Sequence, residues 1–167
     1  LQLKSKKKNM KNMKKILLLT LTCILSFSAC NNEDILSNNE DIPSNTDLYG
    51  NNPDAFVTIW KTNNPGSTED NQIEIPGIGK NYKVFWEEIA NPSNNGLETA
   101  TNSHTITFPE VGIYKISISG GAPAFNQIKF SSSNSKKIIS IEQWGTIEWS
   151  SFEDAFWGCG NLNASAT

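Results

Sequence analysis

Arginine is absent from the 167 residues of this chain, and histidine occurs once, as His104. Without arginine the chain cannot form the bidentate guanidinium pairs that favour phosphate recognition. One histidine and no Cys-x-x-Cys pair leave no ligand set for a zinc site, so we expect no metal and no cofactor. We expect His104 to pack at the edge of a sheet.

Cysteine is also scarce, with three in the whole chain. Cys23 and Cys30 lie in the apolar N-terminal region, so only Cys159 is left for the rest of the sequence. A single thiol cannot form an internal disulfide. No histidine lies near Cys159 in the sequence to activate it, and we therefore predict a packed side chain rather than a nucleophile.

Long apolar runs are missing too. A transmembrane helix needs roughly 20 apolar residues, whereas the longest apolar stretch spans only residues 16–27. Lysines precede this stretch and Ser28-Ala29 close it, which is the order of a secretory signal peptide. We predict a leader and lipoprotein signal peptide over residues 1–29.

The four residues Phe27-Ser28-Ala29-Cys30 resemble a bacterial lipobox. The resemblance implies that the thiol of Cys30 receives diacylglycerol and that Cys30 becomes the mature N-terminus. The alternative is an ordinary signal peptide that is cut near Ala29. Because two or more acyl chains hold a protein firmly on a membrane, we expect a membrane partner through a lipid anchor and no membrane span.

The charge of the chain changes sign after this signal. Beyond residue 29 there are seven lysines and 17 acidic residues, a net charge of −10. Such a negative surface repels phosphate backbones, so we exclude nucleic acid as a partner.

Residues 31–37 read Asn-Asn-Glu-Asp-Ile-Leu-Ser, and residues 38–44 repeat them with Pro43 in place of leucine. The proline and the presence of only two copies exclude a coiled coil. We predict that residues 30–54 are the acylated cysteine and a flexible acidic tether. Its acids resemble the stretch that directs Bacteroidetes lipoproteins to the outer leaflet, which implies a bacterial outer-membrane protein exposed on the cell surface.

Short β-rich segments, separated by Asn, Gly, Pro and Ser clusters, fill residues 55–143. The cleanest period of two places Tyr114, Ile116 and Ile118 on one face of a strand. This spacing predicts one antiparallel β-sandwich domain over residues 55–143. The seven expected strands are residues 55–62, 72–75, 82–87, 103–108, 113–119, 125–130 and 137–141.

Two stretches of this region resemble PKD-like and immunoglobulin-like sandwich domains. Residues 84–88 stand where such domains have a V-x-W-G-D-G turn, although Glu87 and Glu88 replace glycine and aspartate. Residues 104–118 stand where they have H-x-Y, a glycine turn and Y-x-V-x-I. Because adjacent strand residues point to opposite faces, the two glutamates cannot form a general acid/base pair, and we expect no enzyme.

The last part of the chain predicts a short helix. Ser150 and Glu153 form a capping box, and Gly158 provides a stop. Phe152, Phe156 and Trp157 would share its apolar face. The expected fold is therefore mainly β: an antiparallel Ig-like/PKD-like β-sandwich after a signal peptide and disordered tether, with a short C-terminal helix.

Residues 141–162 resemble the opening of the BspA-family leucine-rich repeat surface proteins, whose units carry an F-x-G-C-x-N-L turn. The matching turn here is Phe-Trp-Gly-Cys-Gly-Asn-Leu at residues 156–162. The resemblance implies that residues 144–167 start a truncated leucine-rich repeat array and that the β-domain serves as its stalk. It also implies a surface-anchored, non-enzymatic lipoprotein that acts in adhesion or protein binding.

Five tryptophans leave a second interpretation open, a carbohydrate-binding module of a cell-surface glycan-capture system. Sugars stack on exposed aromatic faces, but packing in the core is the favoured role for most of these rings. We take Trp144, Trp149 and Trp157 as the candidate ligand-binding aromatics for an extracellular protein or glycan. Two or more coplanar exposed tryptophans would favour the glycan.

Overall fold

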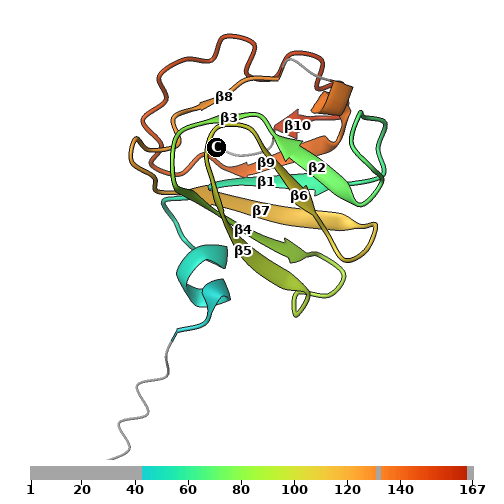
Figure 1. Ribbon diagram of the computed structural model, residues 1–167, viewed down its shortest axis with the longest axis horizontal. Coiled ribbons are helices and arrows are strands. Elements are labelled where there is room, and N and C mark those ends of the chain that lie inside the picture. Colours follow the sequence, from blue (N-terminus) through green and yellow to red (C-terminus); the bar gives the residue numbers. More distant parts are fainter. Residues whose placement is uncertain (1–42, 131–132, 165–167) are drawn as a thin grey trace, which may run out of the picture. The chain divides into compact units, whose positions relative to one another are not determined.

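The computed structural model of the chain describes residues 43–130 and 133–164 (Figure 1). The lipobox predicted at Phe27, Ser28, Ala29 and Cys30 and most of the predicted tether lie outside the described residues. The described residues are mainly β-strand and belong to one compact unit of the chain. No helix within these two ranges is long and apolar enough to cross a membrane.

A six-stranded sheet forms the larger layer of the fold, in the order β10-β9-β1-β7-β4-β5. Its neighbouring strands run antiparallel, except that β10 pairs with β9 in parallel. The strands are β1 (Phe56–Lys61), β4 (Tyr82–Glu88), β5 (Asn95–Ala100), β7 (Ile113–Ser119), β9 (Ile138–Gln143) and β10 (Asn163–Ala164).

Two small antiparallel sheets make the second layer, and Figure 1 shows them lying across the long strands. Their strands are β2 (Gln72–Ile75) with β6 (His104–Thr107), and β3 (Gly77–Ile78) with β8 (Gln127–Ile128). A π-helical turn, η1 (Thr46–Gly50), and a 3-10 turn, η2 (Ser133–Lys136), lie outside the sheets. The mainly β, antiparallel architecture predicted from the sequence is confirmed.

The core lies between the two layers. Tyr114, Ile116 and Ile118 point into it from β7 and are at most 1% exposed, as their period of two predicts. Apolar side chains of β2, β6 and β8 meet them from the second layer: Ile73, Ile75, Ile106 and Ile128. Removing these side chains from water is the main favourable term in folding, at roughly 25 cal/mol per Å² of apolar surface.

The other face of β4 also carries an aromatic residue, as expected from its sequence. Phe85 points away from the core, yet it is fully buried because η1 covers it. A Cβ atom at Gly50 would lie only 2.9 Å from Cε1 of Phe85, so the turn packs directly against the ring. The segment just before β1 is therefore part of the folded unit rather than of the predicted tether.

Strand β5 was not among the seven predicted strands. Its sequence begins Asn95-Gly96, which is typical of a turn. The structure places Gly96 opposite Trp86, and a Cβ atom there would lie 2.5 Å from Cζ2 of the Trp86 ring. The glycine is needed because the indole covers the strand, a contact that local sequence does not reveal. The strand predicted at residues 125–130 is shorter than expected, with only Gln127–Ile128 paired.

The helix predicted from Ser150 to Gly158 is not formed; this segment is a series of turns. The predicted cap does not form either, because Ser150 donates from both its amide and its hydroxyl to the carbonyl oxygen of Asn126. Asp154 has a positive φ of 54°, which interrupts a right-handed helix. Tertiary hydrogen bonds thus override a segment too short to be a stable helix on its own.

These turns pack against the sandwich. Ala155 is 2% exposed, and several larger side chains of the same segment lie partly buried on the core: Trp144, Ile147, Trp149, Phe156, Cys159 and Leu162. The packing is continuous across residue 143, where the sequence analysis places the change from sandwich to repeat. The tail therefore completes the core that the strands begin.

Candidate functional site

The tail is tied to the start of β1 by Gln143, the last residue of β9. Its Nε2 donates to the carbonyl oxygens of Asn52 at 2.9 Å, Pro53 at 3.0 Å and Ala55 at 2.8 Å. The backbone amide of Thr146 donates to the carbonyl of Asp54 at 3.1 Å. These bonds fix the Gln-Trp-Gly sequence that opens the predicted repeat against the opening of the sandwich.

Gly145 lies between these bonds with a φ of +65°. A Cβ atom at this position would collide with the carbonyl oxygens of Asp54 and Ala55. Only glycine combines this conformation with so close a backbone contact. The glycine that follows Trp144 therefore has a structural role that does not involve a ligand.

The candidate ligand-binding tryptophans do not share one environment. Trp144 and Trp149 are partly buried, and both contact the ring of Phe56, at centroid distances of 5.6 and 5.0 Å. Their own planes meet at 83°, so they form no flat pair. Trp157 is 67% exposed. Trp60 and Trp86 are core residues at 1% and 8% exposure.

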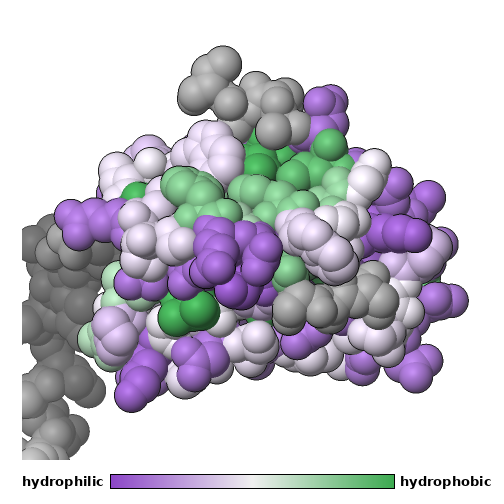
Figure 2. Space-filling model, turned by 90° about the horizontal axis from the view of Figure 1, so that it is seen from above, coloured by the Kyte–Doolittle hydropathy of each residue, from purple (hydrophilic) through white to green (hydrophobic). Residues whose placement is uncertain are grey.

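Apolar side chains gather on part of the face that Figure 2 shows from above. Three of the exposed large apolar residues belong to β3 and to the tail: Ile78, Phe152 and Trp157. Phe152 is 55% exposed, and its ring meets that of Trp144 edge to face and that of Trp149 at a tilt of 37°. Exposed aromatic residues of this kind are typical of protein-binding surfaces.

One edge of the main sheet is formed by β10, which pairs with β9 and with no other strand of the described residues. Asn163 lies opposite Ser140 and Ala164 lies opposite Ile141, so the chain returns to a parallel position after 23 residues. Parallel neighbours need a crossover connection, and residues 144–162 provide it as turns.

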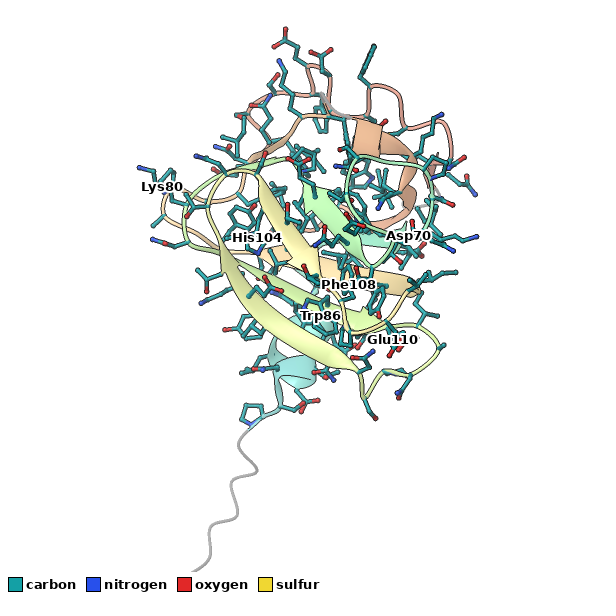
Figure 3. The ribbon with its side chains drawn as sticks, turned by 45° about the vertical axis from the view of Figure 1, so that its right-hand side comes forward. Asp70, Lys80, Trp86, His104, Phe108 and Glu110 are labelled. Atoms are coloured by element: carbon teal, nitrogen blue, oxygen red, sulfur yellow. The ribbon has the colours of Figure 1, made fainter. Side chains whose placement is uncertain are left out.

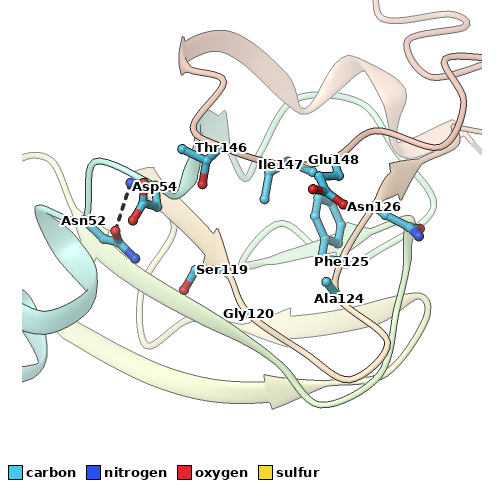
Figure 4. A pocket seen from close by; sticks show the side chains of 10 residues that line it. All are labelled: Asn52, Asp54, Ser119, Gly120, Ala124, Phe125, Asn126, Thr146, Ile147 and Glu148. Carbon is cyan, nitrogen blue, oxygen red and sulfur yellow. Dashed lines mark hydrogen bonds between the residues drawn. The ribbon is translucent and has the colours of Figure 1, made fainter.

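A cleft of about 660 Å³ opens beside this junction (Figure 4). Four segments line it: residues 52 and 54 before β1, residues 119 and 120 at the end of β7, residues 124–126, and residues 146–148. Asp54 and Glu148 contribute carboxylates, whereas Asn52 and Asn126 contribute amides. This cleft could not be predicted from the sequence, because its residues lie in four distant segments and share no motif.

His104, Glu87 and Glu88 each have a side-chain partner within the sandwich. Figure 3 shows His104 at the start of β6, where its Nε2 lies 2.6 Å from Oε2 of Glu98. Glu87 pairs with Lys115, and Glu88 accepts from Asn94. Figure 3 also shows Trp86 and Phe108 meeting between the layers, at a centroid distance of 5.3 Å. Within residues 43–130 and 133–164 no group of His, Cys, Asp and Glu could hold a metal.

Cys159 is a half-buried thiol, and its Sγ lies 4.0 Å from the carbonyl oxygen of Trp157. Burial raises the pKa of Cys159 to about 12. The thiol therefore stays protonated at neutral pH and lacks the thiolate that a nucleophile requires. This agrees with the packed side chain expected from the sequence.

Lys137 is a structural residue that sequence analysis did not single out. It is 1% exposed, and its Nζ donates to three oxygens of the loop that precedes β2 and to one oxygen of the first residue of β2. The acceptors are the carbonyl and hydroxyl oxygens of Thr68 and the carbonyls of Glu69 and Gln72, all at 2.8 to 3.1 Å. Burial lowers the pKa of Lys137, and the nearby acids Asp70 and Glu69 oppose this shift.

Comparison of the chain with protein-family models, curated proteins and solved structures finds no match.

Proposed function

We propose that this protein is a lipid-anchored surface protein whose β-sandwich begins a leucine-rich repeat array and holds it out for adhesion or protein binding. The observation that carries this proposal is the parallel pairing of β9 with β10, in which Asn163 faces Ser140 from 23 residues further along the chain. Leucine-rich repeats return a parallel strand every 20–29 residues, roughly. The turn sequence at residues 156–162 lies within this return.

In such an array each repeat covers the exposed side of the one before it. As the edge strand of the main sheet, β10 has one side that pairs with no described strand, and a strand of the next repeat would pair there in the same direction. The sandwich then acts as the N-terminal cap and stalk of the array. We propose an Ig-like or PKD-like identity for it, on the strength of residues 84–88 and 104–118.

A protein partner fits the exposed aromatic residues of the tail better than a glycan stacked on tryptophan. Trp144 and Trp149 are perpendicular and partly buried, so they offer no flat platform for a sugar ring. Trp157 and Phe152 are exposed and would take part in a protein interface.

The array is tested by the gene itself. The codons beyond Thr167 should encode further units with an F-x-x-C-x-x-L pattern, spaced by about 23 residues as the β9–β10 register requires. A stop codon directly after Thr167 would remove the array from the proposal and leave a single β-domain.

The anchor is tested by replacing its cysteine. The unaltered protein, expressed in a Bacteroidetes host, should incorporate labelled fatty acid, remain with the outer membrane and be cut by protease added to intact cells. Cys30→Ser should lose the label and appear in the medium, whereas Cys23→Ser should behave like the parent. Membrane retention of the Cys30→Ser protein would contradict the lipid anchor.

The adhesive role is tested on the same cells. Cells that display the unaltered protein should adhere to surfaces coated with extracellular matrix proteins more strongly than cells that express Cys30→Ser. Equal adhesion of the two strains to every coated protein would count against an adhesin.

A further inference from the structure

The cleft between the start of β1 and the tail has rigid walls. The backbone amide of Asp54 donates a hydrogen bond to Oδ1 of Asn52 at 2.9 Å. The carbonyl oxygen of Asp54 in turn accepts a hydrogen bond from the backbone amide of Thr146. On the opposite wall the carbonyl of Asn126 accepts both the amide and the hydroxyl of Ser150. These hydrogen bonds fix the backbone of both walls, so the cleft is preorganised for a ligand.

The polar side chains of the cleft remain available. The carboxylates of Asp54 and Glu148, the amide of Asn126 and Nδ2 of Asn52 make no hydrogen bond or ion pair with any residue that the structure describes. Figure 4 shows Asp54 at one end of the cleft and Glu148 near Phe125, well apart from it. The two carboxylates therefore lie at separate points of the cleft.

The chemistry of the lining selects the ligand. Among the residues that the structure describes, no lysine or histidine lines the cleft, and its two carboxylates repel anions, so phosphates and acidic sugars are disfavoured. A single ammonium ion would meet only one of the separated carboxylates, and it would leave the N–H donors of both asparagine amides without an acceptor. Hydroxyl groups, in contrast, donate to carboxylates and both donate to and accept from amides.

We propose that this cleft binds a neutral saccharide. Its hydroxyl groups would bond to Asp54, Glu148, Asn52 and Asn126, while Ile147 and Ala124 provide an apolar wall for the ring carbons. The volume lies within the range of small-ligand sites, roughly 300–1,000 Å³. The tryptophans are not required, because none of them lines the cleft. This site is independent of the repeat array and of its protein partner.

Nuclear magnetic resonance titration of the isotope-labelled protein tests the proposal. The probes are the neutral disaccharides cellobiose, maltose, lactose and N,N′-diacetylchitobiose, with 3′-sialyllactose as the acidic counterpart of lactose. At least one neutral probe should give saturable shifts at the amides of Gly120, Asn126 and Thr146. The affinity should be insensitive to salt. If lactose binds, 3′-sialyllactose should bind more weakly than lactose.

Two variants assign the binding to the cleft. The double substitution Asp54→Asn and Glu148→Gln should weaken binding about tenfold or more, because hydrogen bonds to charged acceptors are the stronger ones. Ala124→Trp should fill the cleft, since Ala124 is exposed on its wall. Glu110→Gln, beyond the opposite end of β7, is the matched control and should leave the affinity unchanged.

Three outcomes would overturn the proposal. The first is the absence of saturable shifts with every neutral probe, and the second is unchanged affinity in the folded Ala124→Trp and double variants. The third is salt-sensitive binding of a cationic probe, N-acetyl-lysine methylamide, without binding of any saccharide. The last result would assign the cleft to a lysine side chain of a protein partner instead.

Discussion

Nε2 of Gln143 lies 2.8 Å from the carbonyl oxygen of Ala55, the residue that precedes β1. The same amide group also reaches the carbonyls of Asn52 and Pro53, so its two hydrogens are shared among three acceptors. One side chain thus joins the end of the last long strand to the beginning of the first. The tail continues from this point and lies on the core.

The first prediction concerns this amide. Gln143→Leu should lower the free energy of unfolding by about 2 kcal/mol, because three carbonyl oxygens lose a donor in a partly buried site. The neighbouring Glu142 is exposed, and Glu142→Gln should change stability by less than about 0.5 kcal/mol. Urea unfolding of the two variants checks the difference. Equal stability would mean that water replaces the amide without cost.

Substitutions at three glycines distinguish the cost of a positive φ from the cost of a steric clash with the backbone. Gly145→Ala should destabilise the protein by more than about 2 kcal/mol, because the new methyl group meets backbone oxygens and the φ is positive. Gly120 also has a positive φ but open space around it, so Gly120→Ala should cost only about 1 to 2 kcal/mol. Gly160 has neither feature, and Gly160→Ala should be nearly neutral. Thermal unfolding in one buffer should give this order, and a different order would refute the assignment.

Much of the sandwich could be predicted because most of its strands have a recognisable pattern in their own sequence. Along β7 the alternation of Tyr114, Ile116 and Ile118 with polar residues sets both the strand and its buried face. No such pattern exists in β5, whose Gly96 is explained by the distant ring of Trp86. Local sequence patterns predict structure that depends on neighbouring residues. A glycine that is required by a contact with a distant residue is easily taken for a turn residue.

The tail shows the opposite error. Ser150 and Glu153 have the spacing of a helix cap, but the hydroxyl of Ser150 bonds to Asn126, which is 24 residues away in the sequence. The cleft could not be predicted for a related reason: Asp54 and Glu148 carry no common motif and line the same cleft only because Gln143 and Gly145 bring the tail to β1.

The buried lysine gives the next prediction. Lys137→Met should lower the free energy of unfolding by about 2 to 3 kcal/mol, because four oxygens of residues 68–72 lose their shared donor. The loop at residues 66–72 should also become more sensitive to proteolysis. Lys136 is exposed and adjacent, so Lys136→Met is the matched control and should be within about 0.5 kcal/mol of the parent. An unaltered loop in Lys137→Met would show that the ammonium does not order it.

Alkaline pH should destabilise the protein through Tyr82. Burial raises the pKa of Tyr82 from 10.0 to about 12. Above pH 10 the unfolded chain releases this proton while the folded chain retains it, so the stabilisation present below pH 10 is lost as the pH rises towards 12. This loss is on the order of 2 to 3 kcal/mol.

Tyr82→Phe isolates this effect. The variant loses the hydrogen bond from the tyrosine hydroxyl to the carbonyl of Asn102 and should be about 1 kcal/mol less stable at neutral pH. Its stability should nevertheless fall less steeply than that of the parent between pH 10 and pH 12. Lys137, whose pKa is lowered, titrates in the opposite sense and is common to both proteins. Parallel curves from urea unfolding would contradict the role of Tyr82.

Removing residues 144–167 tests whether the sandwich can fold without its tail. The truncation uncovers Phe56, which loses the rings of Trp144 and Trp149, and Phe130, which loses that of Phe156. Deleting one buried tryptophan side chain costs about 3 to 5 kcal/mol, and whole domains are stable by only about 5 to 15 kcal/mol. The shortened chain should therefore lack a cooperative unfolding transition.

Point variants show which part of the tail is responsible. Trp144→Ala should remain folded but lose about 3 kcal/mol, because its ring packs on Phe56. Trp157→Ala should change stability by less than about 0.5 kcal/mol, since this ring is 67% exposed. If the truncated chain unfolded cooperatively at the midpoint of the parent, the tail would rest on an independently stable sandwich. In that case Trp144→Ala should change the free energy of unfolding as little as Trp157→Ala does.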